Sequence, residues 1–127
     1  GQGVVFAETA PRRLAASLGA GADVLACGRR GYDFAMDPAT PGALEAEELP
    51  DLVQRYAFAA EIARATGFTG VQVHAAHGYL LSSFLSPASN RRTDDWGGSV
   101  ANRARLLIDI IRATRQRVGA DFAISVK

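Results

Sequence analysis

Two histidines and one lysine are the residues of this sequence whose types and spacing indicate a site for chemistry. His74 and His77 lie three positions apart, and Lys127 ends the sequence. Imidazole and ammonium groups can stabilise negative charge that develops on a bound oxygen. Each residue also has a plainer interpretation, because a histidine at a strand end is commonly a hydrogen-bonded structural residue and a lysine is commonly solvated. The choice depends on where the surrounding elements place the three side chains.

Other chemistries find less support in the sequence. The spacing of His74 and His77 could hold a metal, but zinc needs a third protein ligand, and Asp94 and Asp95 are distant along the chain, so we predict no metal site. Neither a G-x-G-x-x-G nor a G-x-x-x-x-G-K-[ST] motif occurs. Cys27 is the only cysteine and has no base nearby in sequence. Because it cannot form an intrachain disulfide, we expect a reducing, cytoplasmic location.

Hydrophobic periodicity predicts an alternation of helices and strands after a poorly readable segment over 1–44, in which 23–27 could be a short strand. The expected elements are a helix over 46–66, a strand over 68–74, a long loop over 75–98 with a helical turn at 80–85, a helix over 99–118 and a strand over 122–127. Gly67 and Gly119 fit left-handed C-caps, and Ser99 fits an N-cap. A strand–helix–strand unit of this kind joins parallel strands, which predicts an α/β fold.

The alternation of side chains along these strands places the candidate residues. Val71 and Val73 should face one side, with Gln72 and His74 on the other. In the last strand, Lys127 belongs to the face opposite its bulky apolar residues. His74 and Lys127 therefore lie at the C-terminal ends of parallel strands, where α/β proteins bind ligands.

Length and composition limit the classes of protein. The 127 residues suffice for one domain, but a complete (β/α)₈ barrel needs roughly 200 or more. Hydrophobic residues make up 48% and charged residues 21%, as in a folded soluble domain. A net charge of +1 gives no electrostatic case for nucleic acid or membrane partners. No apolar run approaches the ~18 residues that a spanning helix requires.

From residue 67 onwards the sequence resembles a known family. The matching motifs, in order, are GFTGVQVHAAHGYLL over 67–81, FLSP over 84–87, NRRTD over 90–94, WGGS over 96–99 and NR over 102–103. The preceding helix also fits, with Tyr56, Ala59 and Ala60 in an aromatic-x-x-Ala-Ala pattern. Together these features resemble the old yellow enzyme family of NADH:flavin oxidoreductases over about 80 residues.

The resemblance implies a (β/α)₈ TIM barrel that binds FMN, of which this chain would supply roughly the third helix, the fourth strand and helix, and the fifth strand. We therefore expect residues 1–127 to form a single, partial FMN-oxidoreductase barrel domain, internal to a longer protein and family-like over 45–127. Gly28-Arg29 resembles the Gly-Arg that follows the third strand of the family. Four loop residues typical of the family are expected to fix the loop: Asn90, Arg91, Arg92 and Trp96.

The resemblance also implies residue roles. In the family, the two polar residues of a His-x-x-His/Asn motif bind the substrate carbonyl oxygen, which would fall to His74 and His77. The tyrosine two residues beyond is a proposed proton donor, here Tyr79. Lys127 matches a basic position near the flavin N1/O2 edge, where arginine is common. The implied catalytic residues are His74, His77 and Tyr79, and the implied cofactor-binding residues are Lys127 and His74.

The function implied is that of an ene-reductase, which uses NAD(P)H to reduce FMN and then passes hydride from the flavin to an activated alkene or enone. A different hypothesis is a non-catalytic fragment that keeps the motifs but cannot hold FMN alone. A third is a Schiff-base lyase that uses Lys127. Exposed sheet edges also lead us to expect association of copies into a homo-oligomer.

Overall fold

The computed structural model of the chain describes residues 5–6 and 44–127. The strand expected over 23–27, and Gly28-Arg29, lie outside the described residues. The described elements are strand β1 (Val5–Phe6), 3₁₀ helix η1 (Ala46–Glu48), helix α3 (Leu49–Ala65), strand β2 (Gly70–Val73), helix α4 (Leu80–Leu85), helix α5 (Val100–Val118) and strand β3 (Ala123–Val126). The helices and strands expected over 46–127 are all present, each within a few residues of its predicted ends.

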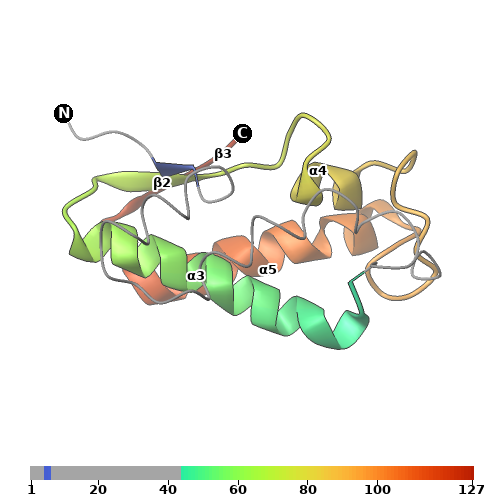
Figure 1. Ribbon diagram of the computed structural model, residues 1–127, viewed down its shortest axis with the longest axis horizontal. Helices are drawn as coiled ribbons and strands as arrows, with labels where there is room; N and C mark the ends of the chain where they lie inside the picture. Colours follow the sequence, from blue (N-terminus) through green and yellow to red (C-terminus); the bar gives the residue numbers. More distant parts are fainter. Residues whose placement is uncertain (1–4, 7–43) are drawn as a thin grey trace.

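The three described strands form one parallel sheet in the order β1-β2-β3. Helices α3 and α5 run side by side below this sheet, and α4 lies beyond its C-terminal end (Figure 1). The connection from β2 through α5 to β3 is a crossover between neighbouring parallel strands, as predicted. This arrangement brings the C-terminal ends of β2 and β3 to the same edge of the sheet.

Local signals at the helix ends account for where the helices begin and end. The backbone N–H of Glu45 donates to the Glu48 carboxylate at 2.9 Å, just before α3 begins. The Ser99 hydroxyl accepts a hydrogen bond from the Asn102 N–H at 3.2 Å and caps α5. Gly67 and Gly119 follow the two long helices with φ values of 88° and 75°, a backbone conformation that side chains rarely adopt.

The core has two parts that share helices α3 and α5. The smaller part lies under the sheet and consists of Ala60, Ala63, Val71, Val118 and Phe122. The larger part joins the long helices to α4, whose Leu80, Leu81 and Phe84 are all buried. The short helix is therefore fixed by its apolar side chains, because six residues alone do not form a stable helix.

The predicted apolar face of β3 is only partly buried. Phe122 is buried and Ile124 is half-buried, but Val126 is 45% exposed. Within the described residues, β3 pairs with β2 alone. Helices α3 and α5 thus cover the beginning of β3 better than its end. Among the described helices, none combines the length and the apolar character needed to cross a membrane.

Thr114 provides a test of the packing of α5. Its side chain is 1% exposed, and its hydroxyl has no hydrogen-bond partner among the described residues. We predict that Thr114→Val raises the free energy of unfolding by about 1 kcal/mol, because a buried unpaired hydroxyl is replaced by a methyl group of similar size. Urea unfolding measures the change. As control, Thr114→Ser keeps the hydroxyl, loses a methyl group and should lower stability; a destabilised valine variant would contradict the prediction.

Candidate active site

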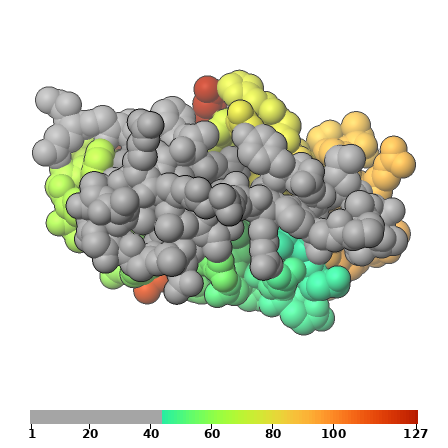
Figure 2. Space-filling view, in the orientation of Figure 1, coloured from blue at the N-terminus to red at the C-terminus, as the bar shows by residue number. Residues whose placement is uncertain are grey.

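The pairing of β2 with β3 sets the position of the candidate site. The two strands are parallel, with Gln72 opposite Ser125 and Val73 opposite Val126. The pairing continues beyond the strands. The Lys127 N–H donates to the Val73 carbonyl at 3.0 Å, and the Lys127 carbonyl accepts a hydrogen bond from the Ala75 N–H at 2.9 Å. Lys127 is thus held directly opposite His74. Figure 2 shows the last residues of the chain beside the segment that leads into α4.

The polar faces of the two strands coincide, as their alternation predicts. The Gln72 side chain donates to the Ser125 hydroxyl at 3.2 Å, so these two residues point to the same side of the sheet. His74 lies two residues after Gln72, and Lys127 two residues after Ser125, on this same side. The predicted meeting of His74 and Lys127 at one edge of co-directional strands is therefore confirmed by the register.

His74 is buried and its proton position is defined by a backbone contact. The side chain is 4% exposed, and its Nδ1 accepts a hydrogen bond from the Ala76 N–H at 3.2 Å. Because Nδ1 is the acceptor, the neutral ring carries its proton on Nε2. Burial lowers the pKa of His74, and the charges of His77 and Lys127 lower it further. The neutral, Nε2-protonated imidazole is therefore favoured at neutral pH.

His77 and Tyr79 complete a cluster of three rings. The His77 ring centroid lies 5.3 Å from that of His74, and the Tyr79 centroid lies 5.0 Å from it, both in edge-to-face orientation. His77 is exposed and Tyr79 is half-buried. His77 also has a φ of 60°, the only positive value among the described residues other than glycine. The structure thus brings together His74, His77 and Tyr79, the predicted catalytic residues, next to Lys127.

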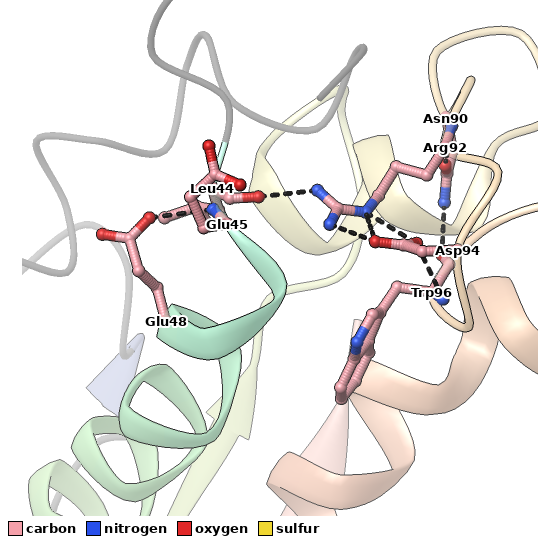
Figure 3. Close-up of polar contacts among 7 residues, drawn as sticks. All are labelled: Leu44, Glu45, Glu48, Asn90, Arg92, Asp94 and Trp96. Carbon is pink, nitrogen blue, oxygen red and sulfur yellow. Dashed lines mark hydrogen bonds and ion pairs between the residues drawn. The ribbon is translucent and has the colours of Figure 1, made fainter. Parts of the chain in front are cut away.

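The loop between α4 and α5 is held by a buried arginine. Arg92 is 3% exposed; its Nη1 donates to the Leu44 carbonyl at 2.7 Å and its Nε donates to the Asp94 carboxylate at 3.0 Å (Figure 3). The hydrogen bond from Arg92 is the main cause that lowers the pKa of Asp94. The guanidinium therefore ties the loop to Leu44, two residues before the 3₁₀ helix that leads into α3.

Asn90 and Trp96 complete this loop network. The Asn90 side-chain amide donates to the Phe84 carbonyl at 2.7 Å and to the Trp96 carbonyl at 2.8 Å. The Trp96 N–H in turn donates to Asp94 at 3.1 Å. The expectation of a loop-fixing role therefore holds for Asn90, Arg92 and Trp96, whereas Arg91 is exposed. The sequence analysis did not assign a loop-fixing role to Asp94, although its position between Arg92 and Trp96 could have indicated one.

The described residues also bear on the metal hypothesis. In the part of the chain that the structure describes, no group of three or more His, Cys, Asp or Glu side chains is arranged to hold a metal ion. His74 and His77 meet ring edge to ring face, and the Nδ1 of His74 is already engaged by a backbone N–H. The pair is thus better suited to donating hydrogen bonds than to ligating a cation.

A crossover of parallel strands with polar side chains gathered at their C-terminal ends is typical of the ligand-binding edge of α/β folds, including (β/α)₈ barrels. The family model of the NADH:flavin oxidoreductase / NADH oxidase family matches residues 15–127. The chain belongs to this family. The match begins well before residue 45, from which the sequence was expected to be family-like.

Individual relatives agree with this assignment. The chain is 47% identical over 87 residues to the NADH-dependent flavin oxidoreductase iccE of Talaromyces variabilis, which covers 68% of this chain and 21% of the relative. It is 48% identical over 81 residues to a probable flavin mononucleotide-dependent alkene reductase of Leishmania infantum. This match covers 64% of this chain and 22% of the relative.

Among solved structures, the old yellow enzyme homologue from Zymomonas mobilis superposes with a TM-score of 0.63 at 42% identity, over 66% of this chain and 23% of that one. The fold is thus a segment of the old yellow enzyme (β/α)₈ barrel. The chain spans about a fifth of the length of the curated relatives it matches.

Arg92 allows a test of the loop network. We predict that Arg92→Lys lowers the free energy of unfolding by about 1–3 kcal/mol, because an ammonium group cannot reach both the Leu44 carbonyl and Asp94 as the planar guanidinium does. The measurement is urea unfolding followed by tryptophan fluorescence, since Trp96 lies in the same network. Arg91→Lys, at the exposed neighbouring position, is the matched control and should leave stability unchanged. Equal stabilities of the two variants would refute the role of Arg92.

A second prediction concerns the protonation of His74. Because its pKa is lowered in the folded state, the unfolded chain binds more protons in the window between that pKa and the ordinary value of 6.5. The stabilisation that His74 contributes is therefore present above this window and is lost as the pH falls through it. Urea unfolding at a series of pH values should show this loss, and His74→Gln should reduce it.

The charge of Lys127 is one cause of the lowered pKa, so its removal should shift the titration of His74. We expect Lys127→Met to raise the pKa of His74 toward the ordinary value, measured by NMR titration of the imidazole. Arg91→Met removes an exposed cation that is not a cause of the shift and serves as control. An unchanged titration in Lys127→Met would show that the two side chains do not interact.

Proposed function

We propose that the protein is an FMN-dependent, NAD(P)H-using oxidoreductase of ene-reductase type, and that this chain forms the part of its active site that binds the substrate carbonyl group. The observation that carries this proposal is the cluster of a buried, Nε2-protonated His74 with His77 and Tyr79 at the strand end that also holds Lys127. The substrate class is a small molecule with an alkene conjugated to a carbonyl group. The alkene-reductase relative in Leishmania infantum supports this choice.

The residues present fit one edge of a flavin site. Lys127 is exposed at the C-terminal edge of the sheet and supplies a positive charge beside the histidine cluster. A cation there suits the N1/O2 edge of FMN, where negative charge collects on reduction. The chemistry that FMN supplies when bound is the transfer of hydride from a reduced nicotinamide to the substrate alkene. As a lysine, residue 127 acts as a point charge, without the fork of an arginine.

The two histidines stabilise charge on the substrate. A carbonyl oxygen conjugated to the alkene gains negative charge as the alkene accepts hydride. Hydrogen bonds from His74 and His77 to that oxygen strengthen as the charge grows, so they stabilise the transition state more than the ground state. His74 is prepared for this task, because the bond from the Ala76 N–H leaves its proton on Nε2 before any ligand arrives.

Tyr79 supplies the proton that completes the reduction. Its ring packs edge-to-face against His74, so the phenol belongs to the same cluster as the two oxygen-binding groups. The hydroxyl is a general acid that protonates the alkene carbon next to the carbonyl group. His74, His77 and Tyr79 are thus catalytic residues in this proposal, and Lys127 and His74 contact the cofactor.

The test begins with cofactor binding. The chain is incubated with FMN, and we expect a bound-flavin absorbance spectrum that bleaches on addition of NADH and recovers with an enone. A chain that binds no flavin would instead support a non-catalytic segment. Borohydride trapping of a carbonyl compound at Lys127 would support a lyase.

For the proton donor, we predict that Tyr79→Phe slows the reoxidation of the reduced flavin by an enone about 10²-fold or more, because general acid catalysis contributes at least that much. Bleaching by NADH should stay unchanged, since it needs no proton from Tyr79. Stopped-flow absorbance separates the two halves. Tyr56→Phe, which removes a hydroxyl from the core side chain of α3, is the matched control. A Tyr79→Phe variant that reoxidises at the unaltered rate would remove Tyr79 from the mechanism.

A further inference from the structure

Two serine hydroxyls on α4 hold the peptide groups between two of the candidate catalytic residues. Gly78 lies between His77 and Tyr79. Its N–H donates to the Ser82 hydroxyl at 3.2 Å, and its carbonyl accepts a hydrogen bond from the Ser83 hydroxyl at 3.0 Å. The first contact orients the peptide that follows His77, and the second orients the peptide that precedes Tyr79. The two serines therefore constrain both peptides that connect the candidate catalytic side chains.

This segment needs such a constraint because its backbone is unfavourable. His77 and Gly78 have consecutive positive φ values of 60° and 77°. A left-handed conformation is uncommon for a residue with a side chain and persists only where the surroundings enforce it. Packing does not enforce it at Gly78, where an added Cβ would meet no described atom within 4 Å. The Tyr79 N–H closes this turn by donating to the Ala76 carbonyl at 3.3 Å, and the hydrogen bonds of Ser82 and Ser83 are further contacts that hold it.

Helix α4 is a firm base for these contacts. Leu81 and Phe84 flank the two serines in sequence and are fully buried in the larger core cluster. The Ser83 N–H donates to the Tyr79 carbonyl at 2.8 Å, and the Ser83 carbonyl accepts from the Ser89 hydroxyl at 2.9 Å. The hydroxyls of Ser82 and Ser83 thus project from a helix that its buried apolar side chains fix in the core.

We propose that Ser82 and Ser83 are positioning residues for His77 and Tyr79, one as hydrogen-bond acceptor and the other as donor. The catalytic meaning of this positioning rests on the proposed function. The physical claim is separate from it: the two hydroxyls keep the rings of His77 and Tyr79 against His74.

The experiment is NMR spectroscopy of the full chain and of the variants Ser82→Ala, Ser83→Ala and their combination. We expect amide hydrogen exchange at Gly78 to rise about tenfold in Ser82→Ala, because its N–H loses its acceptor. The NOE between the His74 and Tyr79 rings should weaken at least about twofold in Ser83→Ala. The NOE between the His74 and His77 rings should weaken at least about twofold in the double variant. Ser82→Thr and Ser83→Thr retain the hydroxyl and should restore the values of the unsubstituted chain.

The matched control is Ser86→Ala. In the unsubstituted chain the Ser86 hydroxyl accepts a hydrogen bond from the Ala88 N–H, after α4, and not from Gly78. It should leave the exchange rate of Gly78 and both NOEs unchanged. Unaltered exchange and NOEs in the two single alanine variants would overturn the proposal, and these variants decide it even if the double variant does not fold.

A kinetic measurement separates this inference from the proposed function. If the flavin-loaded chain reduces an enone, the double alanine variant should slow reoxidation about tenfold without changing bleaching by NADH, a split that general destabilisation would not produce. If the chain binds no flavin, that result supports a non-catalytic segment, while the NMR results still support or overturn the positioning role.

Discussion

The candidate site depends on one interaction, the parallel pairing of β2 with β3. Lys127 is hydrogen-bonded to the residues on both sides of His74, so the register alone sets the imidazole beside the ammonium group. At the opposite end of this pairing there is no space for a side chain at Gly70. A Cβ at Gly70 would lie 2.8 Å from both the Cβ and the carbonyl oxygen of Ala123. Arg115 supports the same register by donating to the Phe122 carbonyl at 2.7 Å at the start of β3. A shift by one residue would move Lys127 to the other face of the sheet.

The loop between α4 and α5 is held in place by hydrogen bonds from side chains to backbone carbonyls. Arg92 and Asn90 satisfy backbone carbonyls that the irregular chain would otherwise leave unpaired, and they link the start of α3, the end of α4 and the approach to α5. The approach of the loop to itself is so close that a Cβ at Gly97 would lie 2.1 Å from the Arg92 carbonyl oxygen. With the loop fixed, the apolar side of α4 stays in the core and its polar side stays next to the ring cluster. The loop between α4 and α5 therefore helps to hold the helix whose serines contact Gly78, next to the candidate catalytic residues.

Much of this architecture was predictable because its causes are local. Helical periodicity placed α3 and α5, the Ser99 cap and Gly67 fixed ends of these helices, and the alternation of Gln72 with His74 predicted which side chains face Lys127. What escaped prediction is non-local or conformational. The Arg92 contact with Leu44 spans 48 positions of sequence, and the exposure of Val126 depends on what packs at the end of β3. The proton position of His74 follows from a single backbone N–H whose direction no sequence pattern gives. The family assignment came from motifs, whereas the site geometry came from the register.

The left-handed backbone at His77 limits how this position can change over evolution. Among residues with side chains, histidine, asparagine and aspartate adopt that conformation most readily, whereas branched aliphatic residues are strongly disfavoured. Of those three, the first two also donate a hydrogen bond through a neutral side chain. Asparagine is thus the substitution for His77 that this backbone and a neutral hydrogen-bond donor would best tolerate. Selection for a different substrate would have little freedom here and would have to act on neighbouring positions instead.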